Sequence, residues 1–500
     1  MDERSAAFTA LGMAVALKQT VAIVCTSGTA VLNLYPAVCE AYYSQIPLLI
    51  LTADRPPHLI DNWDGQCIRQ TNIFEKHILG SFTFDPLKPD QDINNELRLC
   101  TFPVMGPVHI NIPLEEPLYE GKNDLFEFDE VKPLPLHGSF APNHVPGDLN
   151  HKKVLLLAGA DDFGSRFSSV LEDLSKLGKV VVLADVISGL HGSQNIDNWD
   201  AICQLANEKL KEELKPDLLI TMGKFTVSKS FKNFIRQNKP IEHWHVTPNH
   251  TIADPFQTNP QEVECHENIF LEWLTRACSE TDNSYYRSWN NISMKVEASL
   301  KTLFNESSFN EFTAVNTLLE QIPPNSFLHS GNSMPVRYLS YLSGKLKGVS
   351  VYANRGTSGI DGSISTAAGT SMVSEDPVFI LTGDLSFFYD INGLWNQYLK
   401  PNFKIIVLNN GGGGIFRLID GPHDLPEREK YFATASERNC ARMAEEFGFK
   451  YSSANDFVSL KKEMEGMCRN NSKPCILEIF TEQDKTISFY KAFKELKIDI

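Results

Sequence analysis

Short apolar runs alternate along the chain with longer amphipathic stretches. The runs are rich in Val, Ile and Leu, and they occupy 21–25, 48–52, 154–158, 180–184, 218–222, 349–353, 378–382, 405–408 and 476–480. Continuous apolar strands of this length are typical of parallel sheets that are covered by helices on both faces. The pattern therefore predicts an α/β chain throughout.

Two polar stretches divide this pattern into three units. Residues 121–150 are rich in proline, glycine and aspartate and show no periodicity, so they predict a linker. Residues 279–310 are also polar and predict a weaker boundary. We therefore expect domains at 1–120, 151–305 and 306–500, each close to the usual domain size of ~100–200 residues.

Composition and charge limit the possible classes of function. The 500 residues carry a formal net charge of -16, which argues against a general nucleic-acid binder. No run approaches the roughly 18 apolar residues of a membrane span, and Met1 is followed by Asp-Glu-Arg and not by a signal peptide. The ten cysteines form no C-x-x-C pair, so we expect a reducing cytoplasm and neither a zinc site nor a disulfide framework.

Polar, glycine-rich loops follow several of the predicted strands. Gly383-Asp384 follows 378–382 and precedes a helix expected at 387–399, and Asn409-Asn410 with four glycines follows 405–408. Because parallel strands bring ligands to their carboxyl ends, we expect oxygens of Asp384 and Asn410 to converge into a Mg²⁺ or Ca²⁺ site with room for phosphate. The alternative is that Gly-Asp caps a helix and Asn-Asn-Gly forms a turn.

A third loop, 354–362, follows the apolar run at 349–353 and precedes a helix of small residues expected at 363–371. The amino end of such a helix can present backbone N–H groups to a phosphate.

The Gly383-Asp384 and Asn409-Asn410 pairs resemble the motif of thiamin-diphosphate enzymes, in which a GD pair precedes an NN pair by one helix and one strand. The resemblance implies that Asp384, Asn410 and the carbonyl of Gly412 hold the metal that anchors the diphosphate. It also implies cofactor contacts from Gly383, Leu385, Ser386 and Ile415.

Longer blocks narrow this resemblance. The stretches "TADRPP", "SGNSMPVRYLS" and "YANRGTSGIDGSISTAAG" are similar to the 2-succinyl-5-enolpyruvyl-6-hydroxy-3-cyclohexene-1-carboxylate (SEPHCHC) synthases of menaquinone biosynthesis. The similarity covers nearly the whole chain and is weakest at 120–300. It implies three doubly wound parallel-sheet domains: an aminopyrimidine-binding domain, a central domain and a diphosphate-binding domain.

The same resemblance implies an activity and an assembly. Members of the family decarboxylate 2-oxoglutarate and add the resulting carbanion to isochorismate, with thiamin diphosphate and Mg²⁺ or Mn²⁺. A homodimer or homotetramer is expected, with each cofactor between the first domain of one subunit and the third domain of its partner.

One acidic residue and one apolar residue match the family's cofactor residues. The catalytic glutamate of the family lies in an Asp-Glu-Arg triplet, which makes Glu3 the candidate to share a proton with N1′ of the cofactor. The alternative is that Glu3 only favours a helix dipole. Ile360 matches the residue that props the thiazolium ring against the aminopyrimidine, unless it is a plain core isoleucine.

Both substrates carry two carboxylates, so the site needs fixed cations, and arginine suits bidentate carboxylate binding. The positions that match the family's substrate residues are Arg55, Gln66, Lys229, Ser333, Arg337 and Arg355, with Ile415 and Phe416 as an apolar wall. Ser333 and Arg337 are expected to bind the distal carboxylate of 2-oxoglutarate. Taken alone, an arginine after a strand most often forms a surface ion pair, but four cations at loop positions of the same units favour a binding site.

The chain departs from the family at two places. Ser230 stands where some members carry a second basic residue, and Met1 directly precedes the triplet, where members have a further strand and helix. The first domain is therefore expected to be truncated. Two alternatives stay open: another thiamin-dependent 2-oxoacid carboligase or decarboxylase, and a homologue that binds the cofactor without activity.

Three histidines are expected to be structural. His243 and His245 have the spacing of a strand and lack a third ligand, and His109 lies in a predicted strand.

Overall fold

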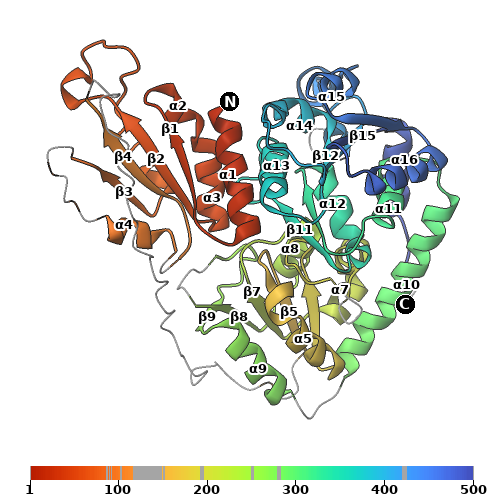
Figure 1. Ribbon diagram of the computed structural model, residues 1–500. Coiled ribbons are helices and arrows are strands. Elements are labelled where there is room, and N and C mark those ends of the chain that lie inside the picture. Colours follow the sequence, from red (N-terminus) through yellow and green to blue (C-terminus); the bar gives the residue numbers. More distant parts are fainter. Residues whose placement is uncertain are drawn as a thin grey trace. The chain divides into compact units, whose positions relative to one another are not determined.

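A computed structural model describes residues 2–85, 88, 91, 93–101, 104–115, 149, 153–191, 196–248, 253–278, 283–418 and 425–498 (Figure 1). The chain divides into two compact units, Met1–Ser139 and Phe140–Ile500, which we describe separately. Except for Leu149, the predicted linker 121–150 lies outside the described residues.

The first unit contains a four-stranded parallel sheet. Its strands are β1 (Val21–Cys25), β2 (Leu48–Asp54), β3 (Gly80–Thr83) and β4 (Val108–Pro113), in the order β1-β2-β4-β3. The helices are α1 (Glu3–Leu17), α2 (Thr29–Asn33), α3 (Tyr35–Ser44) and α4 (Asn94–Leu99), with 3₁₀ turns η1 (Pro57–Leu59) and η2 (Glu75–His77). Helix α1 packs against β1 and α3, and this layer buries side chains such as Phe8 and Leu11.

A buried hydrogen-bond network joins the carboxyl halves of β2 and β4. Asn111 Nδ2 donates to Asp54 Oδ2 at 2.7 Å, so its Oδ1 accepts from Thr52 Oγ at 2.8 Å and from Gln70 Nε2 at 2.9 Å. Because the Thr52 proton is used, His109 Nε2 must carry the proton in its 2.8 Å contact with Thr52 Oγ. His109 is fully buried, and its Nδ1 has no hydrogen-bond partner among the described residues, so it is a neutral core histidine, as expected.

The neutral state of His109 predicts a loss of stability in acid. Burial lowers the pKa of His109 to about 4, from the ordinary 6.5. The folded state thus binds fewer protons than the unfolded chain, so the contribution to stability is complete above pH 6.5 and is lost as the pH falls through 4. A difference of this size is worth roughly 3 kcal/mol.

We expect the hydrogen-exchange protection of the β2 and β4 amides to fall between pH 6.5 and 4. A His109→Gln variant, whose amide can still donate to Thr52, should show a flatter pH dependence in these strands. An unchanged dependence in that variant would assign the acid sensitivity to other groups.

The second unit contains two parallel sheets. The first has strands β5 (Val154–Ala158), β6 (Val180–Ala184), β7 (Leu218–Met222), β8 (Glu242–Thr247) and β9 (Gln261–Glu264), in the order β6-β5-β7-β8-β9. Its helices are α5 (Phe163–Lys176), α6 (Trp199–Leu205), α7 (Glu208–Leu214), α8 (Lys229–Gln237) and α9 (Glu267–Ala277). His243 and His245 both hydrogen-bond to Thr221 at 2.9 Å, so they are structural here, as expected.

The other sheet of this unit has six strands. They are β10 (Ser326–Ser330), β11 (Val349–Ala353), β12 (Val378–Gly383), β13 (Phe403–Asn409), β14 (Lys450–Ala454) and β15 (Cys475–Phe480), in the order β11-β10-β12-β13-β15-β14. The helices are α11 (Glu311–Leu319), α12 (Met334–Tyr341), α13 (Ser363–Val373), α14 (Asp384–Tyr389), α15 (Ala441–Glu446), α16 (Phe457–Arg469) and α17 (Gln483–Lys494). Short turns complete it at η3 (Ser343–Lys345), η4 (Ile391–Leu394), η5 (Gly414–Arg417) and the π-helical η7 (Arg428–Ala433). The predicted α/β fold with three parallel sheets is confirmed.

The polar stretch 279–310 contains a long helix, α10 (Ser284–Glu306), which runs along the second unit (Figure 1). The helix packs against α6, α7 and β6 through one apolar stripe. The buried members of the stripe are Tyr285, Trp289, Ile292, Val296 and Leu300. The polar composition of this stretch predicted a boundary, whereas the spacing of its apolar residues is that of an amphipathic helix.

The single helix predicted at 387–399 is wrong. Helix α14 ends at Tyr389, and only the 3₁₀ turn η4 follows it. The buried Asp390 carboxylate accepts hydrogen bonds from the backbone N–H of Ser365 at 2.8 Å and from its hydroxyl at 3.0 Å. Gly393 also lies so close to Ser365 that a Cβ would come within 2.7 Å of Oγ. These contacts with α13 stop the helix.

Within the described ranges, no helix has the length and apolar character needed to cross a bilayer.

Candidate functional site

Asp384 lies where β12 ends and α14 begins. Strands β12 and β13 are neighbours, with Gly383 paired to Leu408, so Asp384 and Asn410 follow adjacent strand ends as predicted. The Asp384 side chain is buried, and its Oδ1 accepts the Leu385 N–H at 2.8 Å. Its Oδ2 is buried and has no hydrogen-bond partner among the described residues. A buried carboxylate oxygen without a donor fits a cation ligand.

Burial raises the pKa of Asp384 to about 6, although the backbone N–H groups of Leu385 and Gly412 act in the opposite direction. The carboxyl group is thus placed in a site of low polarity, where its charge needs compensation.

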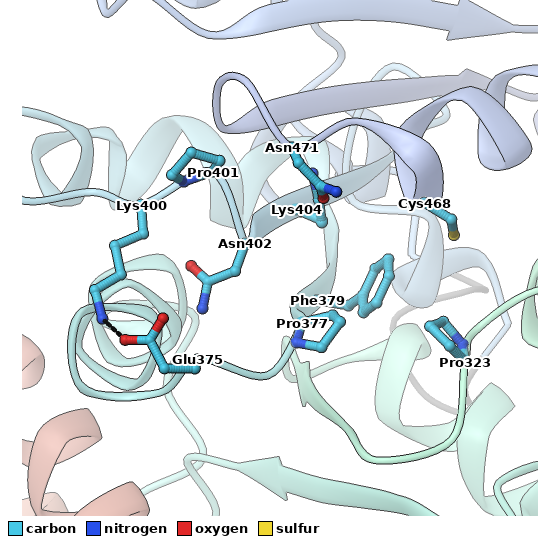
Figure 2. A pocket seen from close by; sticks show the side chains of 10 residues that line it. All are labelled: Pro323, Glu375, Pro377, Phe379, Lys400, Pro401, Asn402, Lys404, Cys468 and Asn471. Atoms are coloured by element: carbon cyan, nitrogen blue, oxygen red, sulfur yellow. Dashed lines mark hydrogen bonds and ion pairs between the residues drawn. The ribbon is translucent and has the colours of Figure 1, made fainter.

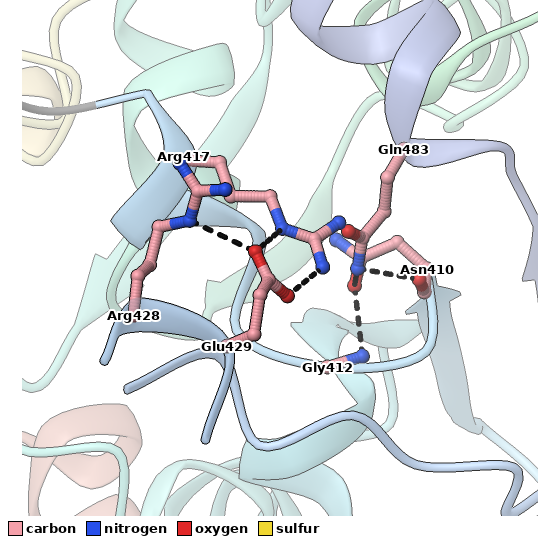
Figure 3. A network of polar contacts seen from close by, with 6 residues as sticks. All are labelled: Asn410, Gly412, Arg417, Arg428, Glu429 and Gln483. Atoms are coloured by element: carbon pink, nitrogen blue, oxygen red, sulfur yellow. Dashed lines mark hydrogen bonds and ion pairs between the residues drawn. The ribbon is translucent and has the colours of Figure 1, made fainter. Parts of the chain in front are cut away.

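Asn409 and Asn410 form two consecutive turns of the same kind. Asn409 Oδ1 accepts the Gly411 N–H at 3.1 Å. Asn410 Oδ1 accepts the Gly412 N–H, also at 3.1 Å (Figure 3). Gly411 and Gly412 have φ values of 77° and 145°, which disfavour other residues. A Cβ on Gly412 would also come within 2.5 Å of the Ala433 carbonyl oxygen. Backbone packing therefore requires glycine at 412.

The three residues predicted as metal ligands lie together. The Gly412 N–H interacts with the Asp384 carboxylate as well as with Asn410 Oδ1. The Gly412 carbonyl accepts the Gly414 N–H at 3.0 Å, which leaves it a second lone pair. One carboxylate, one amide and one carbonyl make an oxygen-rich set with few protein ligands. Such a set suits Mg²⁺ or Mn²⁺ that also binds phosphate oxygens.

No group of three or more His, Cys, Asp or Glu side chains that could hold a metal occurs in the described part of the chain.

Gln483 belongs to this cluster and was not predicted. It is the first residue of α17, and its Nε2 donates to the Asn410 carbonyl at 2.8 Å (Figure 3). Its Oε1 is buried without a hydrogen-bond partner among the described residues. Gln483 follows β15, the neighbour of β13, so the rule that ligands gather at carboxyl strand ends could have found it.

An ion-pair cluster lies beside the glycine loop. Glu429 accepts from Arg417 Nε at 3.0 Å and from Arg428 Nε at 2.8 Å, and it also pairs with the second guanidinium nitrogen of Arg417 (Figure 3). The cluster ties η5 to η7 and so holds the segment that carries Ile415 and Phe416. Phe416 packs against Phe432 with ring centroids 5.7 Å apart, and both Ile415 and Phe416 are half-buried.

The remaining cofactor candidates lie in the loop before α13 and at the start of α14. Ile360 is 39% exposed, so it is not a plain core isoleucine. Its carbonyl accepts the Ser386 hydroxyl at 2.7 Å, which joins the two segments. The start of α13 is an unfavourable place for the predicted phosphate, because the buried Asp390 carboxylate already binds the Ser365 N–H.

Two predicted substrate residues meet at the start of α12. Ser333 has φ 76°, a conformation that is strained for a residue other than glycine and that is common at functional sites. Arg337, one turn further, donates through Nη1 to the Ser333 carbonyl. Arg355 donates through Nη1 to Asn332 Oδ1 at 2.8 Å, so Asn332 links the loops that carry Ser333 and Arg355.

Side chains from the neighbouring sheet also act on these arginines. The pKa of Asp185 is raised, because the effect of burial is larger than the opposite effects of its hydrogen bonds and of the Arg355 charge. Burial likewise raises the pKa of Asp200 to about 6 against the effect of Arg337, and Asp200 accepts a hydrogen bond from Ser340 at 2.6 Å. Both carboxyl groups are buried. The two arginines are therefore not isolated surface ion pairs.

Lys229 begins α8 and is exposed. The neighbouring Ser230 hydroxyl donates to Gln204 at 3.0 Å, so this position serves the contact between α6 and α8. Lys232 was not predicted, yet burial and the nearby charge of Arg355 both lower its pKa. The carboxylates of Asp185 and Asp200 act on that pKa in the opposite direction.

The candidates of the first unit lie at the carboxyl ends of its strands. Glu3 is the first residue of α1, and its charge, together with the larger effect of burial, raises the pKa of Cys25 at the end of β1 to about 11. Arg55 directly follows β2 and lies 4.0 Å from Asp64. Gln66 has φ 58°, and its backbone lies so close to Gly28 that a Cβ there would come within 3.3 Å.

A cavity of about 270 Å³ lies in the second unit at the amino ends of β12 and β13 (Figure 2). Pro377, Phe379, Lys404 and Cys468 are among its lining residues. No predicted site residue lines it, so it is distinct from the cluster at the carboxyl ends.

Three family models match the chain: the N-terminal binding domain of thiamine pyrophosphate enzymes at 1–76, a middle domain at 148–329 and the C-terminal binding domain at 339–479. The benzoylformate decarboxylase of Polynucleobacter necessarius shares the fold, with a TM-score of 0.69 and 14% identity over 97% of this chain and 91% of that one.

Curated relatives are more similar in sequence. The SEPHCHC synthase of Flavobacterium johnsoniae is 37% identical, over 99% of this chain and 91% of its own length. That of Cytophaga hutchinsonii is 38% identical, over 99% and 90%. Given such identity over almost its full length, the chain belongs to the SEPHCHC synthase family of thiamin-diphosphate enzymes.

Proposed function

We propose that the chain decarboxylates 2-oxoglutarate and adds the remaining succinyl unit to isochorismate, giving SEPHCHC and CO₂ in menaquinone biosynthesis. The relatives named above support the reaction. The observation that carries the proposal is the cluster of Asp384, Asn410 and Gly412, with its buried and unpartnered carboxylate oxygen.

In the proposed site, the chain's own residues bind, orient and hold protons. Asp384, Asn410 and the Gly412 carbonyl would hold Mg²⁺ or Mn²⁺, and Glu3 would hold a proton for N1′. Thiamin diphosphate, when bound, supplies the nucleophilic carbon and the electron sink for decarboxylation. Ile360 would support the thiazolium ring, and Ile415 and Phe416 would exclude water.

The substrate residues divide by position. Ser333 and Arg337, joined at the start of α12, would bind the distal carboxylate of 2-oxoglutarate. The others, which are Arg55, Gln66, Lys229 and Arg355, would serve isochorismate or the adduct. Asp185 and Asp200 would hold the arginines in place by charge.

We also propose a homodimer or homotetramer in which the first domain of a partner subunit completes each cofactor site. A cytoplasmic location fits the ten cysteines, none of which forms a disulfide in the described part of the chain.

The test is turnover by the purified chain with thiamin diphosphate, Mg²⁺ and isochorismate, with 2-oxoglutarate or pyruvate as the donor. The proposal is supported if SEPHCHC forms with 2-oxoglutarate as the donor and no product forms with pyruvate. A preference for pyruvate would favour another thiamin-dependent carboligase, and cofactor binding without turnover would favour an inactive homologue.

Arg337→Ala should impair the use of 2-oxoglutarate without weakening cofactor binding. Loss of a charge-assisted hydrogen bond costs about 1.5–3 kcal/mol, so we expect kcat/KM to fall by roughly ten- to a hundredfold. Steady-state kinetics and calorimetry would measure the two effects. Arg469→Ala, on the exposed face of α16, is the matched control, and an equal result for both variants would remove Arg337 from the site.

A further inference from the structure

Glu311 is a buried carboxylate at the first position of α11, outside every motif considered above. Its Oε1 accepts a hydrogen bond from Asn410 Nδ2 at 2.7 Å, and its Oε2 accepts one from the Tyr338 hydroxyl at 2.8 Å. Its backbone N–H donates to Thr486 Oγ on α17 at 3.2 Å. The starts of α11 and α17 and the middle of α12 therefore meet beside the Asn409-Asn410 turns.

The contact with Glu311 decides which way the Asn410 amide faces. The two ends of an amide have nearly the same shape, but only the nitrogen donates hydrogen bonds. Because a carboxylate oxygen accepts, it requires the NH₂ group of Asn410 on its side. Oδ1 is then turned toward the Gly412 N–H, on the side of Asp384. A rotated amide would present its NH₂ group there and would repel a cation.

The same carboxylate connects the Asn410 turn to the predicted donor-binding helix. Tyr338 is the residue after Arg337 on α12, which begins directly after Ser333. Gln483 holds the Asn410 backbone from the other side, through the 2.8 Å contact with its carbonyl. Asn410 is thus fixed at both its side chain and its backbone.

Asn409 has a parallel arrangement that provides a control. Its Nδ2 donates to Glu478 Oε1 at 2.7 Å, and Glu478 Oε2 accepts from the Tyr451 hydroxyl at 2.8 Å. Each asparagine of the pair therefore donates to a buried glutamate that also accepts from a tyrosine. Only Asn410 is a proposed metal ligand.

We propose that Glu311 is a positioning residue, which orients the Asn410 amide so that Oδ1 faces the metal of the cofactor site. The inference rests on the proposed function and adds a residue to the metal site. Carboxylates that orient a ligand in this way commonly affect metal affinity by about 10- to 100-fold.

The test uses the full chain without substrate. Calorimetry at a series of Mg²⁺ concentrations gives the concentration at which thiamin diphosphate binding is half-maximal. Glu311→Leu removes the acceptor, so this concentration should rise by roughly tenfold or more. Glu311→Gln keeps an acceptor oxygen for Asn410 and can donate to the Tyr338 oxygen, so it should restore most of the affinity.

A pair of tyrosine variants separates orientation from a general loss of stability. Tyr338→Phe removes the hydrogen bond to Glu311 Oε2 and so holds the carboxylate less firmly. The Mg²⁺ concentration for half-maximal cofactor binding should then rise by about threefold or more. Tyr451→Phe removes the corresponding tyrosine contact from Glu478, whose Oε2 keeps the Cys440 N–H at 3.0 Å, and it should leave the requirement unchanged. Thermal unfolding without cofactor shows which variants fold. If Glu311→Leu does not fold, the two tyrosine variants decide whether Glu311 orients Asn410.

The outcomes are distinct. Failure of the unmodified chain to bind thiamin diphosphate with Mg²⁺ would count against the proposed function itself. Normal binding by that chain, with the same Mg²⁺ requirement in Glu311→Leu or with equal shifts in both tyrosine variants, would overturn the role of Glu311 alone. A Glu311→Gln variant as weak as Glu311→Leu would also overturn it, because orientation needs only an acceptor.

Discussion

Asp384→Ala should abolish binding of thiamin diphosphate at ordinary Mg²⁺ concentrations, with a loss in affinity of at least about a hundredfold. Asp384 is the one carboxylate among the three proposed ligands, and its Oδ2 has no hydrogen-bond partner among the described residues. Without it, a dication between protein and diphosphate would rest on an amide and a carbonyl. Neither group carries the charge that a hard cation needs to offset its dehydration.

Calorimetry with thiamin diphosphate and Mg²⁺ measures this loss directly. Asp376→Ala is the matched control, because Asp376 is exposed and lies just before β12, whereas Asp384 directly follows it. The control should bind like the unmodified chain. Unchanged affinity in Asp384→Ala would exclude Asp384 as the metal ligand, even if the chain remained active.

The sequence pattern predicted the strands that are apolar throughout but missed some mixed ones, such as β10. Strands β12 and β13 are buried along their length and stand out as continuous runs. Strand β10 lies between β11 and β12, yet its sequence Ser-Phe-Leu-His-Ser has too few apolar residues to form a run. Its polar side chains are buried by tertiary packing, which no local pattern records.

The metal candidates could be predicted because they follow strands that are easy to recognise. Asp384 and Asn410 each directly follow a buried strand, so the topology of a parallel sheet alone brings them together. Glu311 could not be predicted in this way, because it lies 99 positions from Asn410 in sequence and begins a helix. The capping box around it, formed by Asn310 and Thr313, indicates only a helix start.

Glu3→Gln should slow exchange of the cofactor's C2 proton by about a hundredfold or more, because general acid–base catalysis contributes roughly 10²–10⁴-fold. A carboxamide matches the shape of the carboxyl group but cannot exchange a proton with N1′. Glu3 begins α1 and acts by charge on Cys25 at the end of β1, so it lies at the carboxyl edge of the first sheet. Deuterium exchange at C2, followed by NMR on the bound cofactor, measures the rate without substrate.

Asp2→Asn is the matched control for this experiment. Asp2 is the N-cap of α1 and accepts the Arg4 N–H at 2.9 Å, and asparagine caps helices equally well. The control should therefore keep both the helix and the exchange rate. If Glu3 only interacts with the helix dipole, Glu3→Gln should instead lower stability by about 0.3–1 kcal/mol and leave exchange unchanged. A catalytic role of Glu3 changes the rate of C2 exchange, whereas a role in the helix dipole changes the free energy of unfolding. Measuring both quantities therefore decides between the two roles.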